Sequence, residues 1–223
     1  MRFTRPAHDL RLAGFGVLTP AGAGTAPLLD RRVDPPARRL LPVDPAGLCG
    51  DPPDQLRRAD RYGAIGYAAA SMAFRDAAAP ADATTLDPRF GVMIGSSIAC
   101  WSANRRFHEE HRDQPPASLS PALFVRTVAN AVNGDISIAR RLAGPCDTFV
   151  SGFTAGAEAL IAAAAAIDAG RADAILAGGV EAPEGFLEPP PEGFPVEAAG
   201  VALLRRGHVA GATPRDDDAL RLV

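Results

Sequence analysis

Five apolar runs in the sequence predict buried β-strands. Residues 9–17 (DLRLAGFGV) alternate between polar and apolar positions, become continuously apolar and end at the turn sequence TPAGAG. The other four runs are short: 90–94 (FGVMI), 146–151 (CDTFVS), 172–177 (ADAILA) and 200–204 (GVALL). Short apolar runs bounded by turn residues are typical of strands buried on both faces of a sheet.

Helical spacing of apolar positions fills most of the intervals between these runs. Residues 60–79 place Ile65, Ala69, Met72 and Ala73 on one face and predict an amphipathic helix. Three more helical segments are expected: a polar one carrying Trp101 and Phe107, one within 120–143, and an alanine-rich one at 154–169. Strands that alternate with helices indicate an α/β domain, here with a five-stranded, mostly parallel sheet covered by helices on both faces.

The length of 223 residues fits one domain. We expect this domain to span residues 1–207, followed by a charged C-terminal tail at 208–223. Residues 25–54 are rich in Pro, Arg and Asp and lack apolar periodicity, so they predict an irregular insertion.

The composition argues against several classes of partner and excludes lysine-based catalysis. The net charge of −3 gives no electrostatic reason to expect nucleic acid or an anionic membrane as a partner. The sequence has no apolar run of about 18 residues, as a membrane span requires, and no apolar signal-peptide core near Met1. The three widely spaced cysteines indicate reduced thiols and a cytoplasmic location. All 23 basic residues are arginine, which excludes a lysine Schiff base and a lysine general base.

The histidines offer one candidate metal site. His108 and His111 flank Glu109 and Glu110, and histidines three residues apart on a helix can bind one metal ion. Because no nearby residue completes the ligand set, we expect a solvated helix face there. Neither a metal nor another cofactor is expected in this chain.

The most informative place is the strand–Gly–helix junction within residues 146–160. A side chain at position 153 opens the helix, where unpaired N–H groups and the helix dipole stabilise an anion. A cysteine there would have a lowered pKa and would be a ready nucleophile. The sequence has Phe153 instead, whose ring can fill space or close a channel but cannot attack a carbonyl.

The segment GPCDTFVSGFTAGAEAL resembles the active-site segment of β-ketoacyl synthases, in which a strand, a small residue and a cysteine open a helix. Six further segments resemble the same family in the same order: LAGFGVLTPAGAG, RADRYGAIGYAAASMAFRDA, RFGVMIGSSIACW, SPALFVRTVANAVNGDISIARRLAGP, ADAILAGGVEAP and VEAAGVALLRRG. Together they cover residues 10 to about 207. The resemblance implies a single thiolase-type half domain.

Two departures from the family pattern bear on activity. Phe153 occupies the position of the nucleophilic cysteine. The family also uses two histidines and a lysine from a second half of the chain, whereas His208 is the only histidine after Phe153 and lysine is absent. Condensing activity by this chain alone is therefore not expected.

The departures resemble one branch of the family, the chain-length factors of type II polyketide systems, and in particular the truncated ones of aryl-polyene systems. The resemblance implies a non-catalytic subunit that pairs with a catalytic ketosynthase and meets acyl carrier protein through that complex. It also implies dimerisation through the strand before the nucleophile position, at Asp147, Thr148, Phe149, Val150 and Ser151. Implied wall residues of the acyl tunnel are Ile98, Trp101, Leu123, Phe124, Thr127 and Phe153.

Other interpretations of the same residues stay open at this stage. The chain could be a catalytically inactive scaffold that self-associates, with Phe153 as core filler and Trp101 and Phe124 as ordinary packing. An enzyme could use Cys100 or Ser151, although no base is evident beside Cys100 and the sequence around Ser151 is not G-x-S-x-G. A dinucleotide loop at 14–16 is disfavoured because no helix opens after it.

Overall fold

The computed structural model describes residues 10–25, 48, 59–79, 86–113, 115, 119–183 and 197–207. The expected tail at 208–223 lies outside these residues, as does the expected insertion at 25–54 apart from Thr25 and Leu48. Leu48 packs against the core.

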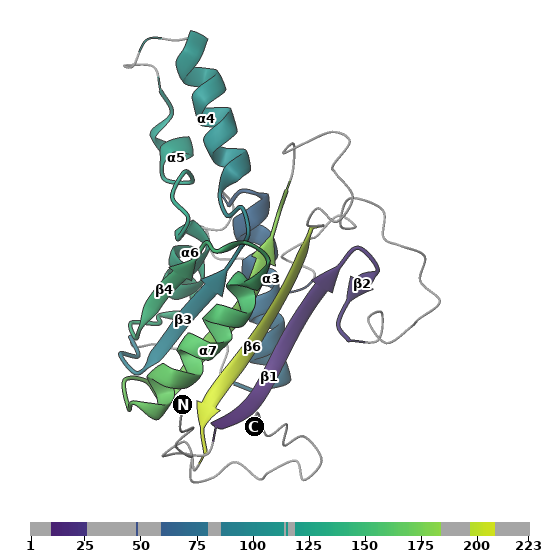
Figure 1. The fold of residues 1–223 in the computed structure, drawn as a ribbon, viewed down its shortest axis with the longest axis vertical. Coiled ribbons are helices and arrows are strands. Elements are labelled where there is room, and N and C mark those ends of the chain that lie inside the picture. The colour runs from purple at the N-terminus through teal and green to yellow at the C-terminus, as the bar shows by residue number, and fades with distance from the viewer. Residues whose placement is uncertain are drawn as a thin grey trace.

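The described residues form one six-stranded sheet with helices on both sides (Figure 1). The strands are β1 (Leu10–Thr19), β2 (Gly22–Ala23), β3 (Phe90–Gly95), β4 (Cys146–Phe149), β5 (Ala174–Glu181) and β6 (Ala198–Arg206). The helices are α3 (Arg61–Asp76), α4 (Trp101–Asp113), α5 (Pro121–Phe124), α6 (Ala131–Arg140) and α7 (Ala155–Asp168), with the 3-10 turn η3 (Gly152–Thr154) before α7. The strand order across the sheet is β2-β1-β6-β5-β3-β4, so β4 is an edge strand.

The predicted α/β class is confirmed, and the structure differs from the expectation in two details. A sixth strand, β2, is a two-residue pairing in the turn after β1. The sheet is mixed: β3 pairs in parallel with β4 and β5, whereas β6 runs antiparallel to both β5 and β1. The helices that join β3 to β4 and β4 to β5 return the chain, so these three strands run in the same direction. β6 lies directly beside β5 and runs in the opposite direction, and such an antiparallel neighbour needs no crossover helix.

Alternating side chains send two apolar clusters to opposite faces of the sheet. From β3, Val92 and Ile94 join the cluster formed with α3 and α6, while Met93 joins the cluster formed with α7. This two-residue period is what a strand buried on both faces requires. The expectation that helices cover both faces is therefore confirmed.

Helices α4 and α5 form an arm that projects away from the sheet (Figure 1). Within the arm, the Phe107 ring lies 5.7 Å from the Phe124 ring and stacks on His111 at 6.4 Å, centroid to centroid. Ser120 caps α5 by accepting the N–H of Leu123 at 3.2 Å. The arm is held together by aromatic packing rather than by the two main clusters of the sheet.

Candidate functional site

The junction between β4 and α7 holds the residue that the resemblance places at the nucleophile position. Gly152 adopts a φ of +79°, a left-handed conformation that favours glycine, and it turns the chain from the strand into η3. Phe153 follows directly, and its side chain is 80% exposed. The ring therefore lies at the surface of the isolated chain, and it is not filler of either apolar cluster.

Glycines fix the position of this junction relative to the sheet. A Cβ atom on Gly95 would lie 2.1 Å from the carbonyl of Ala155, and one on Gly156 would lie 3.1 Å from the Cα of Gly179. The first turn of α7 thus packs directly on the backbones of β3 and β5. A side chain at Gly95 would push the helix, and Phe153 with it, away from the sheet.

A carboxylate occupies the first turn of α7 beside Phe153. The hydroxyls of Ser151 and Thr154 donate to the Glu158 carboxylate at 2.6 Å and 2.7 Å. These two hydrogen bonds lower the pKa of Glu158, so this group is charged near neutral pH. The junction therefore presents an exposed apolar ring next to a negative charge, and the Ser151 hydroxyl is engaged with an acid rather than with a base.

The predicted interface strand lies along the open edge of the sheet. Among the described strands β4 pairs only with β3. Val92 and Ser96 donate their N–H groups to the carbonyls of Pro145 and Phe149. Because hydrogen bonding alternates along a strand, the N–H and C=O groups of the intervening residues face outward. Asp147, Val150 and Ser151 are exposed, and Thr148 and Phe149 are half-buried.

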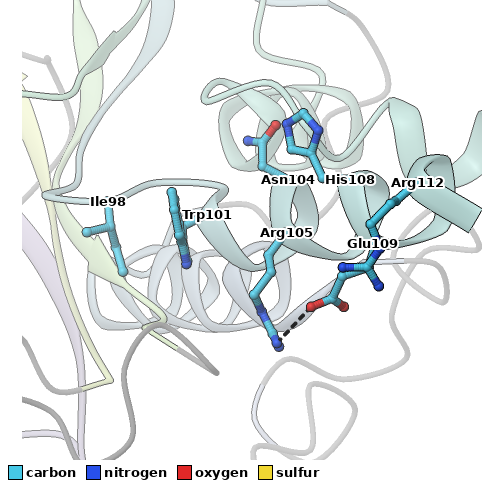
Figure 2. A pocket seen from close by; sticks show the side chains of 7 residues that line it. All are labelled: Ile98, Trp101, Asn104, Arg105, His108, Glu109 and Arg112. Atoms are coloured by element: carbon cyan, nitrogen blue, oxygen red, sulfur yellow. Dashed lines mark hydrogen bonds and ion pairs between the residues drawn. The ribbon is translucent and has the colours of Figure 1, made fainter.

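Two of the predicted tunnel residues line one open pocket that runs along α4 from the turn before it (Figure 2). The pocket has a volume of about 540 Å³ and is lined by Ile98, Trp101, Asn104, Arg105, His108, Glu109 and Arg112. Ile98 and Trp101 form its apolar end, and charged side chains follow along α4, where Arg105 forms an ion pair with Glu109 at 3.2 Å. The pocket thus changes from apolar to charged along one helix face.

The other predicted tunnel residues lie on the neighbouring segment or apart from it. Phe124 is exposed on α5 and packs against Phe107, Leu123 is buried, and Thr127 is half-buried. The Thr127 carbonyl accepts from the Cys100 thiol and from the Asn104 amide, both at 3.1 Å, which ties the two segments together. Phe153 is not among the residues that line this pocket.

Cys100 has the surroundings of a packing residue. Its thiol donates to the Thr127 carbonyl, and burial raises its pKa, so the nucleophilic thiolate is disfavoured. The Asn104 amide, which donates to the Cys100 sulfur at 3.1 Å, cannot act as a base.

Two acidic groups whose pKa values are raised in the fold were not anticipated from the sequence. Glu181, at the end of β5, accepts from the Ser96 hydroxyl at 3.1 Å and from the Ser97 N–H at 2.5 Å, and burial raises its pKa. Asp135 on α6 forms a 2.5 Å ion pair with Arg126, and burial raises its pKa as well. The acid two residues after the Gly-Gly pair that follows the 172–177 run was the available signal for Glu181.

Metal binding finds no support in the described ranges: no three His, Cys, Asp or Glu side chains gather there as a ligand set. His108 and His111 instead lie at the Phe107 ring, His111 stacked on it and His108 edge-on at 6.4 Å. No helix of the described residues is long and apolar enough to cross a membrane.

Comparison with known sequences identifies the family. The family described as "Beta-ketoacyl synthase, N-terminal domain" matches residues 44–188. The 3-oxoacyl-[acyl-carrier-protein] synthase 2 of Rhizobium meliloti (strain 1021) is 32% identical over 131 residues, which are 59% of this chain and 31% of that protein. The matched region thus spans about a third of the length of that relative.

Solved structures share the fold. One titled "The ishigamide ketosynthase/chain length factor" has a TM-score of 0.70 at 21% identity, covering 92% of this chain and 64% of its own. A ketosynthase (ApeO) in complex with its chain length factor (ApeC) from Xenorhabdus doucetiae has a TM-score of 0.63 at 18% identity, covering 89% and 79%. With the match at 44–188 and the strand–turn–helix junction in place, the chain belongs to the β-ketoacyl synthase family, of which it contains the N-terminal domain.

Proposed function

We propose that this chain is a non-catalytic subunit of chain-length-factor type, which pairs with a catalytic ketosynthase and forms part of the wall of its acyl tunnel. The observation that carries the proposal is Phe153. The family places its nucleophilic cysteine at this junction, and here a phenyl ring that is 80% exposed stands in its place. A phenyl ring cannot form a thioester, so the condensing nucleophile must come from a partner chain.

The relatives support a role in acyl-chain elongation. The related synthase of Rhizobium meliloti is named for an acyl-carrier-protein substrate. Two structural neighbours carry "chain length factor" in their titles, and one is a complex with a ketosynthase. The partner would accordingly condense acyl units held on acyl carrier protein, and this chain would form no covalent intermediate.

The open edge of β4 and the arm supply a surface for such a partner. Asp147 on β4 and Val150 and Ser151 just after it are exposed along an edge that pairs with no second strand among the described residues, which makes it a ready site for strand addition. Phe124, Val125 and Val128 are large apolar side chains exposed on and after α5. Exposed apolar groups of this kind are typical of surfaces that become buried on association.

The apolar end of the pocket supplies candidate tunnel residues. Ile98 and Trp101 lie side by side there (Figure 2). The segment that carries Phe124 is held next to them, because the Thr127 carbonyl accepts hydrogen bonds from Cys100 and Asn104. Bulk at Trp101 and Phe124 would limit how far a growing acyl chain can extend. Phe153 would add a second apolar wall at the junction.

Co-expression with a catalytic ketosynthase from the same genome tests the proposal, with light scattering after size exclusion and a malonyl-condensation assay. We expect a stable one-to-one complex that condenses malonyl units, while neither chain does so alone. A homodimer that ignores the ketosynthase would instead support the inactive scaffold. Stoichiometric labelling of Cys100 by an active-site electrophile, with condensation by this chain alone, would contradict the non-catalytic role.

A further inference from the structure

The turn between β3 and α4 is strained and carries the two residues at the apolar end of the pocket. Ala99 has a φ of +46°, in the left-handed region that non-glycine residues rarely adopt. Such a conformation is unfavourable for a residue with a side chain and persists only where its surroundings hold it. Ile98 directly precedes Ala99 and Trp101 follows it by two residues, so the turn determines where both side chains point.

Hydrogen bonds from one side chain hold this turn. The Glu181 carboxylate accepts from the Ser96 hydroxyl at 3.1 Å and from the Ser97 N–H at 2.5 Å, and the N–H of Ile98 also stabilises its charge. The Ser96 oxygen in turn accepts the N–H of Ala99 at 2.8 Å. A continuous set of hydrogen bonds therefore runs from the end of β5 to the strained residue.

The chemistry of the turn calls for a carboxylate in particular. An ionised carboxylate only accepts hydrogen bonds, whereas a glutamine amide has two donors and one acceptor oxygen. The groups that face Glu181 include two backbone N–H groups and the Ser96 hydroxyl, all of which donate to it. The Tyr62 hydroxyl is also buried beside this group, and burial raises the pKa of both side chains.

We propose that Glu181 is a positioning residue, which holds the Ser96–Cys100 turn in its strained form and so sets the placement of Ile98 and Trp101 in the pocket. The placement of Trp101 follows from the contacts of this chain alone. Its consequence for acyl-chain length rests on the proposed function.

Fluorescence of Trp101 tests the positioning role without any partner, because Trp101 is the only tryptophan in the chain. In Glu181→Ala we expect a red-shifted emission maximum and an acrylamide quenching constant raised by up to about two-fold, since the side chain is already 42% exposed. Glu181→Gln keeps one acceptor oxygen and should fall between the wild type and Glu181→Ala. Val180→Ala is the matched control, because Val180 is the preceding residue of β5 but packs into the core.

Circular dichroism establishes that each variant is folded before the fluorescence is compared. Emission and quenching in Glu181→Ala equal to those of the wild type would overturn the proposal. So would an equal change in Val180→Ala, which would indicate general loosening of β5. Where Glu181→Ala will not fold, the smaller change in Glu181→Gln decides by the same criteria.

The assembled complex tests the consequence for product length separately. If the wild-type chain pairs with a ketosynthase, Glu181→Gln should broaden the range of product lengths, whereas Val180→Ala should not. If Trp101 moves in the Glu181 variants but no ketosynthase pairs with the wild type, the proposed function fails and the positioning role stands. If pairing occurs and product lengths are the same in Glu181→Gln, the link between the turn and chain length is refuted.

Discussion

Replacing Thr148 by proline tests whether the outer edge of β4 pairs with a partner strand. Pro145 and Phe149 turn their carbonyls toward β3, so by alternation the N–H of Thr148 faces outward. Proline is tolerated at an edge position whose N–H makes no bond within the sheet, and the chain should still fold. Across an interface, the change removes one donor, worth about 0.5–1.5 kcal/mol net, and brings a ring against the incoming strand. A total loss of about 1–3 kcal/mol corresponds to binding weakened by about 5- to 150-fold.

Isothermal titration of each variant against the separately purified ketosynthase measures this loss, and thermal unfolding of the free chain shows that the fold is kept. Thr148→Val is the matched control, because it retains the N–H and a β-branched side chain. It should bind within about two-fold of the wild type, as expected for a small surface change. Binding by Thr148→Pro as tight as that of Thr148→Val would refute pairing through β4.

Three further perturbations have outcomes that follow from the structure. Phe124→Ala in the assembled complex should lengthen the products or broaden their range, because it removes bulk from the arm; unchanged products with intact pairing would remove Phe124 from the tunnel wall. Arg140→Ala should lower the free energy of unfolding by about 2–3 kcal/mol. The Arg140 guanidinium lies 5.4 Å from the centre of the Tyr67 ring and 5.2 Å from that of the Phe74 ring. It also donates to the buried Ser71 hydroxyl at 2.8 Å. Denaturant titration measures this, and Arg75→Ala, on the exposed end of α3, should change it by less than about 0.5 kcal/mol. Asp173→Asn should flatten the fall of Tm on acidification below about pH 5. The hydrogen bond from Arg89 lowers the folded-state pKa of Asp173. The stability that this pair provides is therefore present above the unfolded-state pKa and is lost as the pH falls through the folded-state pKa. An equally steep fall in the variant would show that this pair does not contribute.

Local pattern was sufficient to predict most elements of the fold. The apolar runs at 90–94 and 172–177 correspond to β3 and β5, and the alanine-rich segment corresponds to α7. The direction of β6 could not be predicted in the same way. A two-residue period is identical in parallel and antiparallel strands, and the partner of β6 on one side is β1, nearly the whole described chain away in sequence.

In the candidate site, too, local features could be predicted from the sequence and long-range contacts could not. The junction at Phe153 is a local feature, a strand, a glycine and a helix in succession, and its position could be predicted. The contact between Glu181 and Ser96 joins residues 85 positions apart. Only the parallel pairing of β3 with β5 brings the ends of the two strands together, so spacing along the sequence could not reveal it.

The junction at Phe153 separates the geometry of a nucleophile site from its chemistry. Gly95 lets the first turn of α7 pack on β3, which places residue 153 where the N–H groups of a helix end could stabilise an anion. The Glu158 carboxylate, kept charged by Ser151 and Thr154, lies in that same turn. Because a nearby negative charge raises the pKa of a thiol, Glu158 would oppose the lowering that the helix end provides to a cysteine restored at position 153. The junction therefore combines the strand–glycine–helix geometry of a nucleophile site with an exposed apolar ring and a charged carboxylate, and under the proposed function this ring would bound the tunnel of the partner chain.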